Sequence, residues 1–424
     1  MYALCDVNSM YASCEKVFDP TIRNKPVVVL TNNDGCICAA CNIAKRAGIG
    51  KKFVPYFQVK QELEKAGAVI KSSNYELYAD LSQRMMETCT RFAPYSHIYS
   101  IDECFLFYGK GAYKPPEGWF EHARSIRRTV WREVRLPIGV GMGLTPTLAK
   151  AANHAAKRLD GFRGVAVIET EQERKSILKQ MAVSDVWGIG RRISKRLNDI
   201  GIHSALDLAN ARADSMRKMF SVLIADTVLE LNGHARISWD DVRSPKKQIF
   251  STRSFGQRVT EKQVLRQAIA THAAIIARKL RKQDSLAVCV MVFAHSSIHA
   301  KEPYYRKAMV CEFSAPTNDT RVITKAMCSQ IDAIYAEGVR FYKCGVGALE
   351  LIDTSHYQPD MFVASQDNKA LMGCLDFINN KYGRNTMYLA AQGIEQKFAM
   401  RRAFLSPQYT TRLADLPKIY CNDV

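Results

Sequence analysis

The sequence has no long hydrophobic run, although 47% of its 424 residues are hydrophobic. No stretch reaches the ~18 apolar residues that a membrane-spanning helix needs. The N-terminus, MYALCDVNSMYASCEKVF, lacks the charged first region of a signal peptide and carries Asp6 in its first apolar run. We therefore expect a soluble, cytoplasmic protein that has sizeable apolar cores and no membrane partner.

Acidic residues are too few to balance the basic ones. The chain has 60 Lys and Arg against 41 Asp and Glu, which gives a formal net charge of +19. Such a surplus concentrates anions near the surface and favours polyanionic partners. Nucleic acid is therefore the expected partner, and a basic solvated surface without a specific partner is the alternative.

Common metal- and phosphate-binding patterns are missing as well. Cys36, Cys38 and Cys41 form a C-x-C-x-x-C, but no Cys or His pair at matching spacing supplies the fourth ligand of a zinc or iron–sulfur site. The stretch GVGMGL ends in Leu144, so it is not a dinucleotide-binding G-x-G-x-x-G, and no P-loop G-K-[ST] follows it. The 13 cysteines are scattered, which is typical of a reducing compartment. We expect the three clustered cysteines to pack in a tight fold.

The length of the chain predicts two to four domains. Strand-like and helix-like patterns alternate over the first 170 residues, which predicts an α+β domain, and residues 170–242 are expected to be helical. A second α/β pattern begins near residue 245 and includes an amphipathic helix over 264–283. The last 70 residues lack a strong period, so we expect a tail that is ordered mainly by partners.

Three acidic residues lie at the ends of predicted strands. Asp6 ends the first strand, and Asp102 and Glu103 lie between the two strands of the stretch HIYSIDECFLFY. Adjacent carboxylates in apolar surroundings ionise cheaply only when a cation is near. Hard oxygen ligands without His or Cys favour Mg²⁺, and two such ions can assist a phosphoryl transfer. A salt-bridged or solvent-facing turn is the alternative.

Several longer stretches occur together in one order. They are CDVNSMYASCE, KPVVVL, SSNYELYADLS, IYSIDECF, GVGMGLTPTLAKAANHAAK, DVWGIGRRISKRL and AAQGIEQKFAMRRAFLSPQYTTR. In this order the chain resembles the Y-family translesion DNA polymerases, in particular the UmuC-like catalytic subunits of bacterial DNA polymerase V. The resemblance implies a right-handed polymerase with a ferredoxin-like palm (1–31 and 78–168), small fingers (32–77), a helical thumb (169–242), an α/β little finger (243–352) and a C-terminal partner-binding tail (353–424).

The resemblance also implies roles for individual residues. Asp6, Asp102 and Glu103 are the expected catalytic acids on two Mg²⁺ ions, and the Val7 carbonyl joins the metal that carries the nucleotide. The other implied positions bind the dNTP: Ser9 and Met10 through backbone N–H groups, Lys45 and Lys157 through charge, and Tyr11 as a steric gate against the ribose 2′-hydroxyl.

Two of the implied fingers positions depart from the family pattern. Lys45 stands where many relatives have arginine, and Asn42 stands where many have tyrosine. Lysine is a point charge and lacks the bidentate fork of arginine, so the grip on phosphate is expected to differ. Cys36 and Cys38 are expected to lie over the nascent base pair.

DNA contacts are predicted in two further regions. The turn from Gly188 to Gly190 opens a helix, so its N–H groups can bind a phosphate in a helix-hairpin-helix, and Arg191, Arg192 and Lys195 add positive charge. In the predicted little finger, Arg253 is expected to grip the duplex backbone.

A short peptide after the predicted little finger resembles a sliding-clamp ligand. The stretch QPDMF matches Q-x-x-[LM]-F, with Gln358, Met361 and Phe362 as the contact residues. Such peptides bind through a few apolar anchors.

The expected activity is attack of a primer 3′-hydroxyl on the α-phosphate of a dNTP, with pyrophosphate as the leaving group. No segment resembles a proofreading exonuclease, so low fidelity is expected, in translesion synthesis during the SOS response. The implied partners are primer–template DNA, a UmuD′-like homodimer, RecA and the sliding clamp, in the bacterial nucleoid. A metal-dependent nuclease and a catalytically silent DNA-binding scaffold are the alternatives.

Overall fold

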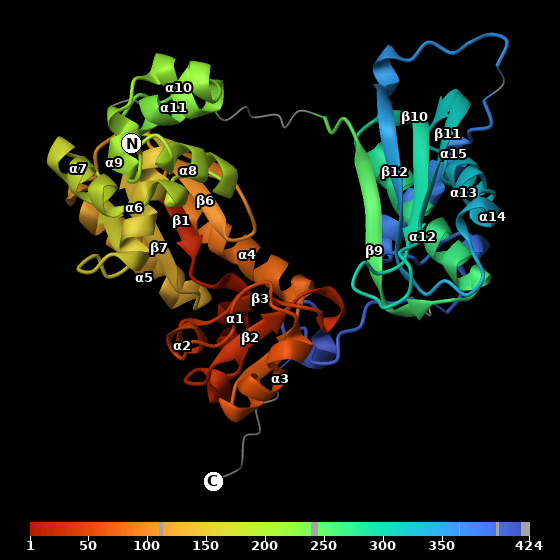
Figure 1. The fold of residues 1–424 in the computed structure, drawn as a ribbon, viewed down its shortest axis with the longest axis horizontal. Coiled ribbons are helices and arrows are strands. Elements are labelled where there is room, and N and C mark those ends of the chain that lie inside the picture. The colour runs from red at the N-terminus through yellow and green to blue at the C-terminus, as the bar shows by residue number, and fades with distance from the viewer. Residues whose placement is uncertain (110–112, 239–244, 364, 396–397, 417–424) are drawn as a thin grey trace. The chain divides into compact units, whose positions relative to one another are not determined.

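The computed structural model divides the chain into two compact units (Figure 1). Unit 1 comprises Met1–Asp241 and Arg402–Val424, and unit 2 comprises Val242–Arg401. The structure describes residues 1–109, 113–238, 245–363, 365–395 and 398–416. The boundary predicted at 242–243 lies outside these residues. None of the described helices has the length and apolar character needed to cross a membrane.

A five-stranded sheet in unit 1 has the order β5-β6-β1-β7-β8. Its strands are β5 (Tyr95–Ile98), β6 (Glu103–Phe107), β1 (Tyr2–Val7), β7 (Ile138–Gly143) and β8 (Val165–Val167). The central strand β1 is antiparallel to both β6 and β7. The two strands predicted on either side of the acidic pair are thus confirmed as β5 and β6.

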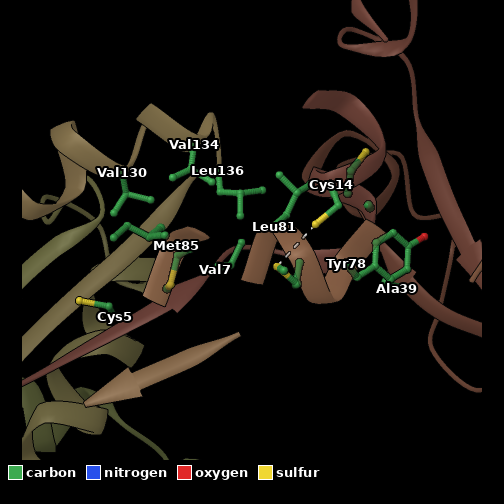
Figure 2. Packing of buried hydrophobic residues seen from close by; sticks show 14 of the residues in the cluster. Cys5, Val7, Cys14, Ala39, Tyr78, Leu81, Met85, Val130, Val134 and Leu136 are labelled. Carbon is green, nitrogen blue, oxygen red and sulfur yellow. Dashed lines mark hydrogen bonds between the residues drawn. The ribbon is translucent and has the colours of Figure 1, made fainter. Parts of the chain in front are cut away.

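The helices on this sheet are α4 (Tyr75–Thr90), α5 (Gly118–Val134) and α6 (Pro146–Arg158). Thr145 caps α6 by accepting a hydrogen bond from the Leu148 N–H at 3.1 Å. Figure 2 shows Tyr78, Leu81 and Met85 of α4 in a core that also holds Cys5 and Val7 of β1. Because side chains alternate along a strand, Leu4 and Asp6 face the other side, where Leu4 packs with Ala149 of α6.

The glycines of β7 have a structural role. A Cβ on Gly141 would lie 2.0 Å from the backbone nitrogen of Asn153, and one on Gly139 would lie 2.7 Å from Cε of Lys157. Only glycine therefore lets α6 approach the strand this closely. The stretch GVGMG serves to seat the helix against the sheet at the level of the acidic residues.

A three-stranded sheet with the order β3-β2-β4 forms a second part of unit 1. Its strands are β3 (Ile37–Ala40), β2 (Val27–Leu30) and β4 (Val69–Ser72), with α1 (Met10–Phe18), α2 (Asn42–Arg46) and α3 (Tyr56–Lys65) beside them. Cys38 donates to the Val29 carbonyl at 3.2 Å, and Cys41 accepts from the Val27 N–H at 3.2 Å. These two cysteines therefore serve the packing of the sheet.

The helical region of unit 1 has its own apolar cluster. Its helices are α7 (Glu171–Gln180), α8 (Arg191–Asn198), α9 (Ala205–Asn210), α10 (Ala213–Met219) and α11 (Val222–Leu231). This agrees with the helical content predicted between residues 170 and 242.

Unit 2 is built on a four-stranded antiparallel sheet with the order β11-β10-β12-β9. Its elements are β9 (Ile249–Val259), α12 (Lys262–Lys282), β10 (Ser285–His295), β11 (Arg306–Thr317), α13 (Thr320–Cys328), α14 (Ile331–Ile334) and β12 (Phe341–Asp353). The apolar face predicted for 264–283 is confirmed, since Leu265, Ile269 and Ile276 of α12 are fully buried.

The C-terminal residues are more ordered than the sequence indicated. Helix α15 (Lys369–Lys381) buries Met372 and Leu375, and Arg281 of α12 binds Asp376 of α15 through two hydrogen bonds of 2.6 and 2.8 Å. Residues 402–416 then pack in unit 1, where Figure 1 shows the blue end of the chain beside the three-stranded sheet. This differs from the expectation of a tail ordered mainly by partners. Its contacts lie with residues far away in sequence, which a periodicity analysis does not detect.

Candidate active site at the end of the central strand

The three predicted catalytic acids meet where β1 and β6 pair. Asp6 lies directly opposite Glu103 in the antiparallel register, and the Val7 N–H donates to the Asp102 carbonyl at 3.0 Å. Asp6 shares the α6 face of the sheet with Leu4, and Glu103 shares it with Phe105, because side chains alternate along each strand. The predicted turn at the acidic pair therefore brings the acids to one place in the fold.

Two lysines of α6 neutralise two of these acids. Lys157 Nζ lies 2.5 Å from Asp6 Oδ1, and Lys150 Nζ lies 2.7 Å from Glu103 Oε1. The four side chains are between 16% and 23% exposed, so these ion pairs are largely shielded from water. Lys150 and Lys157 are seven residues apart on one helix, which places them on the same face two turns apart.

The electrostatics of Asp6 indicate a site for cations. Burial raises the pKa of Asp6, the charge of Lys157 lowers it, and the charges of Glu103 and Asp102 raise it again. Three mutually repelling carboxylates supply the hard oxygen donors that suit Mg²⁺. Within the described ranges no three His, Cys, Asp or Glu side chains are already arranged around a common metal position, and two of the acids bind lysines. The donor chemistry thus fits a divalent metal.

The N-terminus of α1 lies directly after β1. Ser9 adopts a left-handed conformation (φ 50°) and precedes Met10, the first residue of this nine-residue helix. The first N–H groups of a helix have no partner within it and favour an anion. Lys45 of α2 donates to the Ser9 hydroxyl at 2.7 Å, so the three-stranded part of unit 1 contributes a lysine to this helix start.

A cluster of positive charge surrounds Lys45. The pKa of Lys45 is lowered, first by burial and then by the charges of Lys52 and Lys157. Lysines from two parts of unit 1 therefore create a positive field next to the helix start. Sequence reasoning missed Lys52, which lies in the loop after Gly50 and carries no motif of its own.

Tyr11 lies on the first turn of α1 with its ring held between two others. The ring stacks on Tyr78 at 4.6 Å and 13°, and it meets Tyr75 edge-on at 5.9 Å. Burial raises the pKa of Tyr11 to about 12, so the ring is neutral at physiological pH. Asn42, the other departure in this region, begins α2 and is exposed.

Lys150 is the second residue that the sequence analysis missed. Its Nζ lies 4.7 Å from the ring centroid of Tyr99 and 5.1 Å from that of Trp187, in addition to its contact with Glu103. Aromatic faces stabilise an ammonium group that is removed from water. Its position seven residues before Lys157 on the same helix was the available signal.

The predicted phosphate-binding turn of the thumb lies directly before α8. Gly188 has a φ of 86°, a conformation that favours glycine, and Gly190 precedes α8. A Cβ on Gly190 would meet nothing within 4 Å, so space remains in front of the helix start. The predicted contact residues Arg191, Arg192 and Lys195 are all exposed.

The remaining predicted contacts lie in unit 2. Arg253 is exposed on β9 opposite Cys344 of β12. In the clamp-like peptide Gln358 is exposed, and Met361 and Phe362 are 94% and 96% exposed. Large apolar side chains this exposed are typical of a binding peptide. These residues belong to unit 2, whereas the acidic residues belong to unit 1.

Comparisons with known proteins agree with this geometry. The impB/mucB/samB family matches residues 5–154, its C-terminal domain matches 246–361, and its helix-hairpin-helix motif matches 171–202. A domain of unknown function, DUF4113, matches 369–419. The chain belongs to the impB/mucB/samB family.

Relatives cover the whole chain. Protein UmuC of Salmonella typhimurium is 41% identical over 99% of this chain and 100% of its own, and protein MucB of Escherichia coli is 38% identical over 98% and 99%. A Y-family DNA polymerase chimera of Dbh and Dpo4 has a similar fold, with a TM-score of 0.60, 19% identity, and coverage of 83% of this chain and 99% of that one.

These findings confirm the predicted family and fold class. The chain is a DNA-binding, DNA-directed DNA polymerase of the translesion class, with a helix-hairpin-helix. Y-family polymerases are metal-dependent nucleotidyltransferases.

Proposed function

We propose that Asp6, Asp102 and Glu103 form the catalytic centre of an error-prone polymerase that extends primers across damaged bases in the SOS response. One observation carries the assignment: the β1–β6 register brings the three acids together beside the start of α1 and a cluster of lysines. The same place on the fold thus offers oxygen donors for a metal and positive charge for a triphosphate.

The acids and the Val7 carbonyl would hold two Mg²⁺ ions, which when bound would lower the pKa of the primer hydroxyl and neutralise charge on the phosphates. Lys157 and Lys150 lie against two of the acids and so hold their carboxylates at the end of the sheet. In the reaction the primer 3′-oxygen bonds to the α-phosphorus, the bond to the bridging oxygen breaks, and pyrophosphate leaves.

The dNTP would lie at the start of α1. Ser9 and Met10 offer backbone N–H groups to the triphosphate, and Lys45 and Lys157 offer positive charge. We propose that the Tyr11 ring blocks the ribose 2′-hydroxyl, since Tyr11 lies one residue after Met10 on the same helix turn. Its stacking on Tyr78 restricts its movement.

DNA would be held through its phosphates. The Gly188–Gly190 turn, Arg191, Arg192 and Lys195 would contact the backbone from the thumb, and Arg253 from the little finger. Because these contacts are with phosphate, binding is expected to be independent of sequence and to weaken with salt.

Protein partners follow from the resemblance to the UmuC-like branch. They are a UmuD′-like homodimer, RecA, and a sliding clamp that would bind Gln358, Met361 and Phe362. The protein would act in the cytoplasm of a bacterium, at the nucleoid. The extreme exposure of Met361 and Phe362 supports the clamp assignment.

The test is primer extension across an abasic site with Mg²⁺, dNTPs and these partners, comparing the wild type with Asp102→Ala. Asp332→Ala is the matched control, because the Asp332 side chain is 75% exposed in unit 2. We expect extension by the wild type and the control, and loss of extension with unchanged DNA affinity for Asp102→Ala. Equal extension by all three proteins would refute the catalytic assignment. Shortening of the DNA by the wild type would favour the nuclease alternative, and DNA binding without extension would favour the scaffold.

A further inference from the structure

Residues 402–410, which we name the C-terminal strap, contact α1, which carries Tyr11, and the start of α4, which carries Tyr78. The strap begins where the chain leaves unit 2 and re-enters unit 1. It is part of the region matched by a domain of unknown function.

The strap is joined to the last residue of β4 by two hydrogen bonds and to the loop after β2 by a third. The Ser72 N–H donates to the Phe404 carbonyl at 3.0 Å, and the Phe404 N–H donates to the Ser72 hydroxyl at 2.9 Å. The Ala403 N–H donates to Asp34 at 2.8 Å, and further along Tyr409 stacks on Phe18 at 5.0 Å. The strap is therefore held to this part of unit 1 by hydrogen bonds and by an aromatic contact.

A chain of buried contacts leads from the strap to the gate. The Ser406 hydroxyl donates to Glu15 Oε1 at 3.1 Å, and the Tyr78 hydroxyl donates to the same oxygen at 2.6 Å. Glu15 lies one turn after Tyr11 on α1, and the Tyr78 ring stacks on the Tyr11 ring. Ser406, Glu15 and Tyr78 are at most 3% exposed, so water does not replace these partners.

The strap also fixes the helix that carries Tyr78. The Asn74 side chain donates to the Ser406 carbonyl at 3.1 Å, to the Ser406 hydroxyl at 2.9 Å and to the Pro407 carbonyl at 3.2 Å. Asn74 caps α4 by accepting from the Leu77 N–H, and Tyr78 follows in the first turn. Figure 2 shows Tyr78 on this helix with its ring directed away from Leu81 and Met85.

We propose that Ser406 is a positioning residue for the Tyr11 ring, so that selection against ribonucleotides depends on the C-terminal strap as well as on the gate. This inference rests on the proposed role of Tyr11. Loss of the Ser406 hydroxyl removes a donor from Glu15 and an acceptor from Asn74. The Tyr78 ring then has more freedom, and the gate tolerates a 2′-hydroxyl better.

The test measures the ratio of kcat/KM for a dNTP to that for the matching rNTP, in the full-length chain with its partners. We expect Ser406→Ala to lower this ratio about three- to tenfold, the scale of one buried hydrogen bond. The kcat for the dNTP should stay within about twofold. Tyr11→Ala should lower the ratio much further, and adding Ser406→Ala to Tyr11→Ala should change nothing, because the two residues act through one ring.

Two further variants make the result decisive. Ser329→Ala is the matched control, because Ser329 is an exposed serine of unit 2 whose hydroxyl donates to the Ala326 carbonyl. Tyr78→Phe keeps the stacked ring and removes only the hydroxyl that binds Glu15. It should lower the ratio as Ser406→Ala does, and it replaces that variant if Ser406→Ala does not fold.

Failure of the strap inference and failure of the gate assignment would give different results. An unchanged ratio in folded Ser406→Ala or Tyr78→Phe, with a collapsed ratio in Tyr11→Ala, would overturn the strap inference and leave the gate intact. Additive losses in the double variant would overturn it too, because the strap would then act elsewhere. An unchanged ratio in Tyr11→Ala would refute the gate assignment and the strap inference together.

Discussion

The end of β1 in unit 1 and the middle of α12 in unit 2 both hold ionisable side chains away from water, but they hold them in different states. In unit 1, Asp6 and Glu103 each lie against a lysine of α6. In unit 2, His272 is 7% exposed, and its Nδ1 is 2.9 Å from the hydroxyl of Ser251. The first region thus pairs its acids with cations, whereas the second favours a neutral imidazole.

The surroundings of His272 explain this difference. Burial is the largest cause that lowers the pKa of His272, and together with the positive charges of Arg253 and Lys279 it brings the pKa to about 4. Arg253 is the proposed DNA contact of unit 2, and Lys279 donates to the carbonyl of Phe250 on the same strand as Arg253. Unit 2 therefore keeps the buried His272 neutral close to two cations, whereas unit 1 gives each of these two buried acids a lysine partner.

The largest effect is expected where the buried charge is functional. Asp6→Asn keeps the size of the side chain but removes a proposed metal ligand, so we expect primer extension to fall by at least about 10³-fold. The free energy of unfolding should change by only about 1 kcal/mol, because burial already disfavours the charged form of Asp6. Single-turnover extension measures the loss of activity, and urea unfolding measures the change in the free energy of unfolding. Retained extension with a large loss of stability would mean that Asp6 serves the fold.

A smaller loss is expected for a cation that acts through one of the acids. Lys150→Met keeps the apolar stem and removes the charge that lies 2.7 Å from Glu103, so the carboxylate is no longer held. We expect kcat to fall about 10²-fold with little change in KM for the dNTP. Lys175→Met is the control, because Lys175 pairs with Glu171 on the surface of α7. Equal effects of the two substitutions would remove Lys150 from the site.

Much of the acidic site in unit 1 could be predicted from the sequence. Asp6, Asp102 and Glu103 lie within motifs, and strand alternation places their side chains, so their meeting follows from local pattern and a correct pairing. Lys150 and Lys52 could not be found in this way, because their roles depend on how closely α6 and the loop after Gly50 approach the acidic site. For α6 that approach is set by Gly139 and Gly141 of β7.

The contacts of the C-terminal strap were even less accessible to prediction from the sequence. Ser406 contacts Asn74 and Glu15 across more than 300 residues, and no periodicity links such positions. Helix α15 was missed as well, although Leu371, Leu375 and Ile378 recur at helical spacing, because the polar residues around them hide a short amphipathic pattern. Contacts between distant segments are decided by tertiary packing, which a single sequence does not display.

The neutral state of His272 predicts a pH dependence of stability. Its pKa is about 4 in the folded protein and about 6.5 when unfolded, so the unfolded chain binds the proton more tightly between these values. The stabilisation is present above pH 6.5 and is lost as the pH falls towards 4. We expect His272 to cost unit 2 about 2 kcal/mol between pH 7 and pH 5.

His272→Gln removes the titrating group and should flatten this part of the profile, measured by urea unfolding at both pH values. His299→Gln is the control, since His299 lies in the turn region between β10 and β11. An unchanged slope in His272→Gln would show that another group titrates in this range.

The smallest effect is expected at the outer surface of unit 2. Arg253→Ala removes one proposed phosphate contact, so we expect DNA affinity to fall about threefold and the slope of log K against log salt to decrease in magnitude by about 0.9. Arg132→Ala on the exposed face of α5 is the control and should leave the slope unchanged. The same Arg253→Ala substitution removes a charge that lowers the pKa of His272, so the stability lost between pH 7 and pH 5 should shrink. A changed salt slope with an unchanged pH profile would mean that the DNA contact of Arg253 and the neutral state of His272 are independent.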